Sequence, residues 1–395
     1  MKKNIIIVSH AMYIGGAERS LLGLLSSFNY DEYNVDLFLM RQEGELFCKI
    51  PKEVNLLPEN TSKYLAIPIK YLFLDKKLNI IFSRLKAKIK AKKFMKSQSN
   101  AALSSVELDY SHKFTLKYIE DINPFIKYDL CISFLTPHYI AMEKVNAKKK
   151  IAWIHTDYST VIVDDKSEIK IWEKFDKIVS ISDDCTNSFL KVFPTLKNKI
   201  IRIDNILTYD MLISDSKYEI VDMDTDKLCF LSIGRFTYQK NFESIPEICK
   251  IIRSHDIDIK WYIIGFGMDE EKIKYNIKKY DMEEFVFILG KKDNPYPYIN
   301  QCDVYLQLSR YEGKSIAVRE AQMLQKPVII TDYPTSHDQV NNNVDGLIVP
   351  LKTNECALAI VDIIKTNKLE IIKKKLMIMN YDNDSEIEKK YQLID

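Results

Sequence analysis

Short apolar runs of strand length alternate along this chain with longer stretches in which apolar residues recur at helical spacing. This alternation predicts βα units, in which each buried strand of a parallel sheet is followed by a covering helix. In the first half the pattern predicts a helix from Ala17 to Phe28 and strands at Asn4 to Ser9, Val35 to Met40, Leu130 to Leu135, Ile151 to Ile154, Ile178 to Ile181 and Ile200 to Ile206.

A second series of strands follows an acidic, irregular stretch at residues 208–226, which we interpret as an interdomain linker. Its members are expected at Leu228 to Ile233, Trp261 to Ile264, Val286 to Leu289, Val304 to Leu308, Val328 to Thr331 and Leu347 to Val349. The pattern predicts two α/β domains, residues 1–207 and 227–368, followed by charged helices over 369–395. The length of 395 residues agrees, because a single core stops growing at roughly 250–300 residues. Ligands of open parallel sheets bind beyond the carboxyl ends of the strands, so we expect both domains to face a cleft.

Composition sets limits on the class of protein. Hydrophobic residues make up 46% of the chain, enough for two cores, yet no run of about 18 uncharged apolar residues occurs. The start, Met1-Lys-Lys-Asn followed by a short apolar strand, does not resemble a signal peptide, and we expect a cytoplasmic protein. Seven cysteines occur singly, with no CxxC pair, which argues against zinc and disulfides and predicts reduced thiols in the core.

Positive charge is concentrated in one segment, Lys63 to Lys96, which holds eleven Lys or Arg and a single acid, Asp75. Apolar residues interleave with these cations, a pattern that predicts an amphipathic helix with a cationic face. Two interpretations stay open. The helix adsorbs to an anionic membrane surface, or it is a solvated lysine-rich helix packed on its own domain. Nucleic acid is not an expected partner, because no recognised nucleic-acid motif accompanies the segment.

The stretch from Cys302 to Thr331 places two carboxylates, Glu312 and Glu320, around the expected start of a helix. That helix is predicted from about Ser315, a candidate N-cap, to Leu324. Its first backbone N–H groups and the positive end of its dipole favour a phosphate. The stretch therefore predicts a pocket for a long ligand with a charged middle and hydroxyls at both ends.

Two further groups lie just after strands and so at the expected binding edge. Gly15 and Gly16 let the backbone approach a ligand closely, although a tight strand-to-helix turn needs the same residues. They match neither a dinucleotide fingerprint nor a P-loop, because the third glycine and the Gly-Lys-Ser/Thr ending are missing. Arg235 and Lys240 follow the first strand of the second half, and two cations at that spacing suit a diphosphate.

His155 and Asp157 come directly after a predicted strand of the first half. A histidine there can donate to a sugar hydroxyl or a phosphate, or exchange a proton, although a lone histidine is more often structural. The acidic run from Asp222 to Asp226 has Asp-x-Asp spacing, but it precedes a strand and lacks the glycine and glutamate of a calcium loop. We therefore interpret it as solvated linker and expect no metal site.

With these residues in place, the chain resembles the family-4 retaining glycosyltransferases, whose fold of two Rossmann-like domains is called GT-B. The similar motifs occur in the family's order and are GGAE from Gly15, GRF with KN from Gly234, IIGFG, FILG ending at Gly290, and EGKSIAVRE from Glu312 followed by KPVIITD. AWIHTDYS, NPYPYI and SRYEGKS further resemble enzymes that build bacterial capsular, teichoic or lipopolysaccharide glycans. The chain departs from the family at Lys314-Ser315, where a bulky residue or proline is common.

The resemblance implies two parallel sheets facing a cleft, an acceptor-binding first domain, a nucleotide-sugar-binding second domain, and a C-terminal helix returning toward the first. Arg235 and Lys240 would bind the diphosphate. Glu320 would accept hydrogen bonds from the ribose, Glu312 would hold the donor sugar's hydroxyls, and His155 would contact that sugar or the acceptor. The full set implied to bind the nucleotide sugar is Gly15, Gly16, Arg235, Lys240, Gly290, Lys314, Ser315, Ile316 and Glu320.

The function implied is transfer of a hexose or N-acetylhexosamine, with retention, from a nucleotide sugar to a lipid-linked or growing surface polysaccharide. UDP is the expected nucleotide, and the enzyme is expected at the inner face of the membrane as a peripheral protein. No metal or other cofactor is expected, because arginine and lysine neutralise the diphosphate. Two alternatives stay open: a non-transferring GT-B enzyme such as a nucleotide-sugar 2-epimerase, and a catalytically silent partner subunit that binds nucleotide or glycan.

Overall fold

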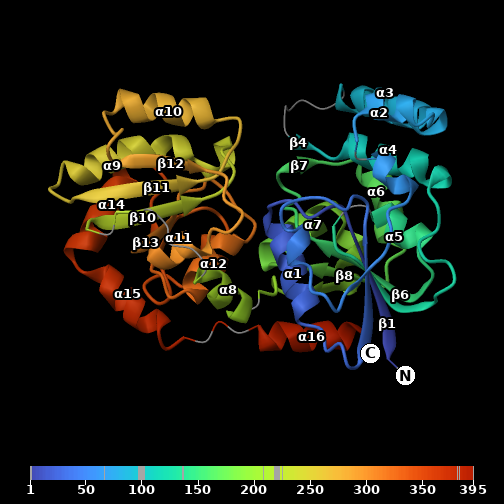
Figure 1. Cartoon of the computed structure of the whole chain (residues 1–395). Helices are drawn as coiled ribbons and strands as arrows, with labels where there is room; N and C mark the ends of the chain where they lie inside the picture. The colour runs from blue at the N-terminus through green and yellow to red at the C-terminus, as the bar shows by residue number, and fades with distance from the viewer. Residues whose placement is uncertain are drawn as a thin grey trace. The chain divides into compact units, whose positions relative to one another are not determined.

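The computed structural model describes residues 2–65, 67–96, 103–135, 138–207, 209–217, 223–224, 226–379, 381 and 383–394. The chain divides into two compact units. We call them the N-terminal unit, Met1–Ile206 with Asp384–Asp395, and the C-terminal unit, Leu207–Asn383. Each unit is built around its own parallel sheet with helices on its faces (Figure 1).

The N-terminal unit contains a seven-stranded sheet in the order β3-β2-β1-β5-β6-β8-β9, in which every neighbouring pair is parallel. The strands are β1 (Lys3–Ser9), β2 (Tyr33–Leu39), β3 (Asn55–Leu56), β5 (Tyr128–Ser133), β6 (Ala147–Ile154), β8 (Lys177–Ser180) and β9 (Ile200–Arg202). A separate parallel pair joins β4 (Leu103–Ser104) to β7 (Val161–Ile162). Neither β3 nor this pair was predicted, because two-residue strands leave no period in the sequence.

Polar side chains cap the N-termini of two helices of this unit. Asp164 accepts a hydrogen bond from Ser167 N at the start of α6, and Ser182 does the same for Cys185 N at the start of α7. The helices are α1 (Gly16–Ser26), α2 (Ile69–Leu74), α3 (Leu78–Met95), α4 (Val106–Thr115), α5 (His138–Lys144), α6 (Asp165–Trp172), α7 (Asp183–Val192) and α16 (Asp384–Ile394).

The last helix, α16, belongs to the N-terminal unit although it follows the C-terminal unit in sequence. Tyr391 donates a hydrogen bond from its hydroxyl to the Ser27 carbonyl at 2.9 Å, and its ring stacks on Tyr33. The expected return of the C-terminal helix to the first domain is therefore confirmed.

The C-terminal unit contains a six-stranded parallel sheet in the order β12-β11-β10-β13-β14-β15. The strands are β10 (Leu228–Ile233), β11 (Ile259–Ile264), β12 (Val286–Gly290), β13 (Val304–Gln307), β14 (Val328–Thr331) and β15 (Leu347–Val349). All six were predicted with ends within two residues of those observed, since strands buried on both faces form apolar runs.

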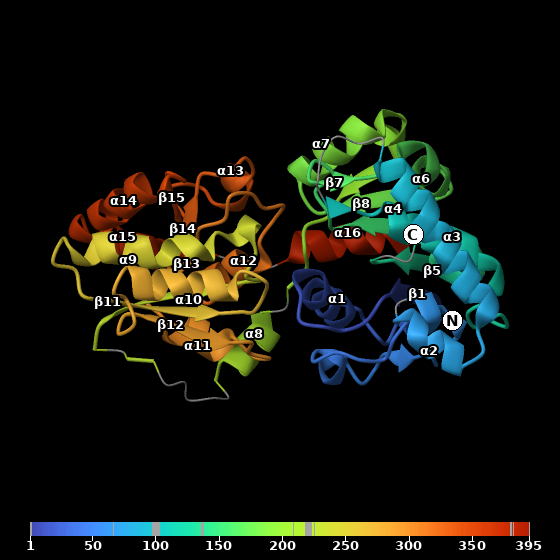
Figure 2. The ribbon, with the colours of Figure 1, turned by 90° about the horizontal axis from the view of Figure 1, so that it is seen from above.

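Two helical layers cover this second sheet (Figure 2). Side chains of α9, α10, α14 and α15 form one core cluster with it, and those of α8, α11 and α12 form another. The bounds are α8 (Tyr209–Ser216), α9 (Ile245–Arg253), α10 (Glu270–Lys279), α11 (Tyr296–Gln301), α12 (Ile316–Met323), α13 (Ser336–Gln339), α14 (Thr353–Lys365) and α15 (Lys368–Leu376).

Three features differ from the sequence-based expectations. The stretch interpreted as irregular linker contains α8, which packs on α11, while Asp222 of its acidic run lies outside the described residues. The basic segment forms two helices, α2 and α3, because the chain turns between them with Lys76 at φ +54°. The cysteines are free, as expected, and six are buried, but Cys48 is exposed rather than in the core.

Candidate functional site

The candidate site lies where the strand order of the second sheet reverses. β10 pairs with β11 on one side and with β13 on the other, so the chain leaves the carboxyl ends of β10 and β13 in opposite directions. Such a reversal opens a crevice in which ligands of open α/β sheets bind. The loop after β10 carries Arg235 and Lys240, and the loop after β13 carries Glu312.

Lys240 and Glu312 form an ion pair across this reversal. Lys240 Nζ lies 2.6 Å from Glu312 Oε1, and the two side chains are 17% and 8% exposed. The stem of Lys240 crosses the end of β10, where a Cβ on Gly234 would lie 3.3 Å from both Cδ and Cε of the lysine. Glycine at position 234 therefore leaves the space through which Lys240 reaches the carboxylate.

The Glu312 carboxylate has further donors. Its Oε1 accepts from Ser309 Oγ at 2.6 Å and from Gln307 Nε2 at 3.1 Å, and its Oε2 accepts from Gln239 Nε2 at 3.4 Å. A buried carboxylate needs such partners to remain charged. None of these three donors was predicted from the sequence. Gln307 could have been noticed in the sequence, because it is a polar residue in the otherwise apolar run of β13.

The two loops are also tied to each other directly. Arg310 N donates to the Gln239 carbonyl at 2.8 Å, and Gln239 Nε2 donates to the Tyr311 carbonyl at 3.0 Å. The Arg310 guanidinium lies over the Tyr238 ring at 4.0 Å and pairs with Glu243 at 3.1 Å. These contacts fix the distance between the loops and hence the pairing of Lys240 with Glu312.

Arg235 differs from Lys240 in being exposed. Its guanidinium makes no ion pair within the described part of the chain. Beside it the turn after β11 packs closely, because a Cβ on Gly265 or Gly267 would collide with backbone atoms of Gly234 or Phe236. The packing of these two glycines is structural, and Arg235 is the cation of the pair that is open to an incoming anion.

A backbone N–H at the start of α12 is already hydrogen-bonded to a side chain, that of Gln339. Ser315 is its N-cap residue, as predicted, but the Ser315 hydroxyl makes no capping bond. Instead the Ser315 N–H donates to Gln339 Oε1 at 2.6 Å, and Gln339 is 3% exposed. The N–H expected to face a phosphate is therefore satisfied by Gln339. Ile316 opens the helix, and Lys314, which also has an interaction partner, lies two residues before it.

Glu320 lies one further turn along α12 and is fully buried. Its Oε1 accepts from the Tyr296 hydroxyl at 2.9 Å, so α11 holds this carboxylate in place. Gly290, at the end of β12, has φ +72°, a left-handed conformation that favours glycine, and open space surrounds the position of its missing Cβ.

The candidate residues of the first half lie in the N-terminal unit. Gly15 is the N-cap residue of α1, Gly16 opens the helix, and the Glu18 carboxylate lies against Gly15. His155 follows the end of β6. Asp157 is turned toward its own loop, where it accepts from Ser159 N at 2.9 Å.

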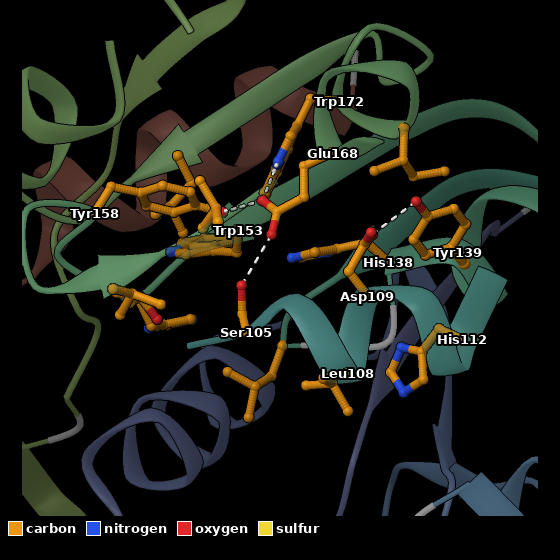
Figure 3. Close-up of a pocket in the computed structure, with 17 residues that line it drawn as sticks. Ser105, Leu108, Asp109, His112, His138, Tyr139, Trp153, Tyr158, Glu168 and Trp172 are labelled. Carbon is orange, nitrogen blue, oxygen red and sulfur yellow. Dashed lines mark hydrogen bonds between the residues drawn. The ribbon is translucent and has the colours of Figure 1, made fainter. Parts of the chain in front are cut away.

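His155 lines a cavity of about 120 Å³ between the ends of β5 and β6 and the helices α4 and α6. Figure 3 shows Trp153 in its wall, with Ser105 and Glu168 hydrogen-bonded to each other across it. Burial lowers the pKa of His155 to about 3 and that of His138 to about 4, so both rings are neutral. Burial and the nearby Asp109 raise the pKa of Glu168 to about 7. This cavity was not predicted, apart from His155.

Residues 215–379 match the family model described as glycosyl transferases group 1. Amylovoran biosynthesis glycosyltransferase AmsD of Erwinia amylovora is 33% identical over 125 residues, covering 32% of this chain and 35% of that protein. The UDP-Gal:alpha-D-GlcNAc-diphosphoundecaprenol alpha-1,3-galactosyltransferase of Escherichia coli is 26% identical over 164 residues, covering 40% and 42%. The alignments with these curated relatives thus span about a third to two fifths of their length.

Solved structures resemble the whole chain in fold. A mutant form of TarM of S. aureus has a TM-score of 0.67 at 16% identity and covers 100% of both chains. HepE of Anabaena has a TM-score of 0.66 at 14% identity and covers 99% of both. The two-sheet fold is thus similar to that of these structures, and residues 215–379 are similar to the group 1 glycosyl transferases.

Two features are absent from the described residues. Among them, no helix combines the length and the apolar character needed to cross a bilayer. Within the same residues, His, Cys, Asp and Glu side chains form no group suited to holding a metal ion.

Proposed function

We propose that the protein is a retaining glycosyltransferase that moves a hexose or N-acetylhexosamine from a UDP-sugar to a lipid-linked or growing surface polysaccharide. The observation that carries the proposal is the pairing of Lys240 with Glu312 at the strand reversal, inside the region that matches the family model. The choice of donor and acceptor rests on relatives such as the E. coli galactosyltransferase, whose name specifies UDP-Gal and a diphosphoundecaprenol-linked sugar.

In this proposal Arg235 and Lys240 neutralise the diphosphate, and the N-terminus of α12 adds backbone donors and a positive dipole end. Glu312 accepts hydrogen bonds from the transferred sugar, and Glu320 from the ribose. The bond from the anomeric carbon to the phosphate oxygen breaks while a bond to the acceptor oxygen forms on the same face. The acceptor's proton passes to the leaving phosphate, so the nucleoside diphosphate departs and retention needs no carboxylate nucleophile.

The direct test is release of nucleoside diphosphate by the purified chain from a panel of nucleotide sugars, with and without a lipid-linked sugar acceptor. Acceptor-dependent release and an α-linked product from an α-linked donor are the expected results, and they should persist in EDTA. Conversion of the nucleotide sugar without acceptor would identify an epimerase instead. Binding of nucleotide without any turnover would identify a silent partner subunit.

The exposed side chains of the basic segment, Lys63 to Lys96, support a second proposal, which concerns where the protein is located in the cell. α3 buries its small residues Ala87 and Ala91 against α4, and this leaves the large side chains Phe82 and Ile89 at 68% and 71% exposure. Leu78 and Leu85 are also exposed, and lysines interleave with all of them. Exposed apolar residues among lysines are typical of helices that lie in a membrane interface. We infer that α2 and α3 bind an anionic membrane surface, where a lipid-linked acceptor would be found.

Vesicle flotation tests this location. Wild-type protein should float with vesicles that contain anionic lipid and remain behind with neutral ones. The double substitution Phe82→Ser with Ile89→Ser should abolish flotation. A matched control is Leu358→Ser on α14, where an apolar side chain 43% exposed is removed from the other unit. Flotation that ignores lipid charge, or an equal loss in the control, would contradict the proposal.

A further inference from the structure

The strand β13 carries hydrogen-bonding side chains along one of its faces. From Val304 to Ser309 apolar residues alternate with residues that bear a hydroxyl or an amide, which are Tyr305, Gln307 and Ser309. Residues two positions apart lie on the same face of a strand, so these three form a polar line. The strand is buried on both faces, and buried polar groups are costly unless they have partners.

The polar line leads to the carboxylate of Glu312. The Tyr305 hydroxyl donates to Gln307 Oε1 at 2.8 Å, and burial raises the pKa of this hydroxyl well above its ordinary value, so it stays protonated. At its other end the amide donates from Nε2 to Ser309 Oγ at 2.7 Å and to Glu312 Oε1 at 3.1 Å. A donor at one end and an acceptor at the other fix which way the amide of Gln307 points.

The two oxygens of the Glu312 carboxylate therefore differ. Oε1 faces Lys240 Nζ at 2.6 Å and also accepts from Ser309 Oγ at 2.6 Å and from Gln307. Oε2 accepts one long hydrogen bond, from Gln239 Nε2 at 3.4 Å. A carboxylate oxygen accepts about two hydrogen bonds, so Oε2 keeps capacity for a further donor such as a hydroxyl group. The side chain is not sealed off, since 8% of its surface is exposed.

A bound diphosphate would make the contact with Gln307 more important. If phosphate oxygens draw Lys240 away, Oε1 loses its cation and keeps the donors of Ser309 and Gln307. A serine hydroxyl can rotate, whereas the amide of Gln307 is held at its far end by Tyr305. Gln307 is then the contact that still fixes the orientation of the carboxylate.

We propose that Gln307 is a positioning residue of the donor site, which holds Oε1 of Glu312 on the protein and presents Oε2 to a hydroxyl of the transferred sugar. The inference rests on the proposed function, in which Glu312 accepts hydrogen bonds from that sugar. Loss of the Gln307 amide then weakens recognition of a sugar hydroxyl and leaves recognition of the phosphates intact.

Deoxy analogues of the donor measure this recognition without turnover. Calorimetry with UDP-hexoses and UDP-N-acetylhexosamines first identifies the donor that the wild-type chain binds most tightly, and its 3-, 4- and 6-deoxy analogues are then compared with it. A site that hydrogen-bonds a hydroxyl penalises its loss, so at least one analogue should bind about tenfold more weakly. In Gln307→Met this penalty should shrink about fivefold, while affinity for UDP changes by less than about twofold.

Gln322→Met is the matched control. Gln322 is buried in the same unit, at 0% exposure against 3% for Gln307, but its Nε2 donates to the Asp345 carbonyl at 3.2 Å. This variant loses a buried amide as well and should keep the wild-type penalty. Tyr305→Phe is a milder second variant, because it removes only the hydroxyl that orients the Gln307 amide. Its penalty should lie between those of the wild type and Gln307→Met.

Three results would overturn the proposal. The first is an unchanged penalty in Gln307→Met, or in Tyr305→Phe if Gln307→Met does not fold. The second is an equal reduction in Gln322→Met, which would show a general loss of packing. The third is a wild-type chain that penalises none of the analogues. A wild-type chain that shows the penalty but releases no nucleoside diphosphate would instead count against the proposed function alone.

Discussion

Lys240 Nζ lies 2.6 Å from Oε1 of Glu312, so the lysine expected to neutralise a diphosphate is paired with the carboxylate expected to hold the sugar. An incoming diphosphate must share Lys240 with Glu312 or take it away. Arg235 is exposed and has no such competitor within the described residues. In the proposed function, a diphosphate therefore binds Arg235 without displacing a partner but must compete with Glu312 for Lys240. Glu312 would then couple binding of the sugar to binding of the phosphates.

The first prediction concerns Glu312→Gln. Without the carboxylate, Lys240 loses its competitor and the site loses a negative charge, so UDP alone should bind about fivefold more tightly, a change of roughly 1 kcal/mol. Turnover of the nucleotide sugar should nevertheless fall about 100-fold or more, because a hydrogen-bond acceptor for the reacting sugar is weakened. Calorimetry with UDP and an assay of diphosphate release measure the two effects.

Glu320→Gln provides the comparison for that prediction. Glu320 is fully buried and accepts from the Tyr296 hydroxyl at 2.9 Å. If it binds the ribose, its amide variant should weaken UDP binding rather than strengthen it. Weaker UDP binding in both variants would mean that Glu312 does not compete for Lys240.

The second prediction separates Arg235 from Lys240. Arg235→Ala should lower UDP affinity about tenfold or more and leave stability unchanged, because the side chain is exposed and unpaired in the described structure. Lys240→Met should lower the free energy of unfolding by roughly 3 kcal/mol, since it strips a cation from a carboxylate that is only 8% exposed. Urea unfolding of each variant measures this difference, and equal stability losses would contradict it.

The sheets could be predicted from the sequence because their signal is local. A strand such as β10 is apolar at nearly every position and is buried on both faces, so its run of residues is visible without knowledge of its neighbours. Lys240 and Glu312 could be placed near each other for the same reason, as each follows such a strand. Their direct contact could not, because it depends on the strand order that brings β10 beside β13.

Side-chain partners across loops left no signal of this kind. Gln339 follows β14 by eight residues, and only the folded loop shows that it reaches the Ser315 N–H. Trp153 fits the apolar pattern of β6, and only the folded structure shows that its Nε1 has no hydrogen-bond partner among the described residues. The break between α2 and α3 was equally hidden, because Lys76 adopts its left-handed conformation without a glycine or proline to mark it.

The third prediction follows from that Gln339 contact. Gln339→Met keeps the volume but removes the acceptor for the Ser315 N–H, so the free energy of unfolding should fall by about 1–3 kcal/mol. A bound diphosphate offers oxygen acceptors at the same helix start. UDP should therefore raise the melting temperature of this variant more than that of the wild type in thermal unfolding. An equal UDP shift in both would place the Ser315 N–H away from the nucleotide.

The fourth prediction concerns the docking of α16. Tyr391 accepts from Asn29 N at 2.8 Å, donates to the Ser27 carbonyl at 2.9 Å and stacks on Tyr33 with ring centroids 5.4 Å apart. Tyr391→Ala should lower the free energy of unfolding by about 2 kcal/mol. Tyr275→Ala on α10, where the side chain is 65% exposed, should change it by less than about 0.5 kcal/mol. Similar effects of the two substitutions in denaturant titrations would show that α16 contributes no more than a surface residue.

The fifth prediction is a pH dependence set by Glu168. Burial and Asp109 raise the pKa of this carboxyl from 4.5 to about 7, so between these values the folded protein binds a proton that the unfolded chain releases. Stability contributed by Glu168 is therefore greatest below about pH 4.5 and falls as pH rises toward 7, by on the order of 3 kcal/mol.

Two variants test this pH dependence. Glu168→Gln lacks the titration, so its free energy of unfolding relative to that of the wild type should rise from pH 4.5 to about 7 and then stay level. Asp258→Asn is the control, because Lys227 and Arg253 lower the pKa of Asp258 below its ordinary 3.8. Its titration therefore lies below this pH window, and its difference from the wild type should stay constant. Urea unfolding at pH 4.5, 6 and 8 measures both, and a constant difference for Glu168→Gln across the three values would contradict the raised pKa.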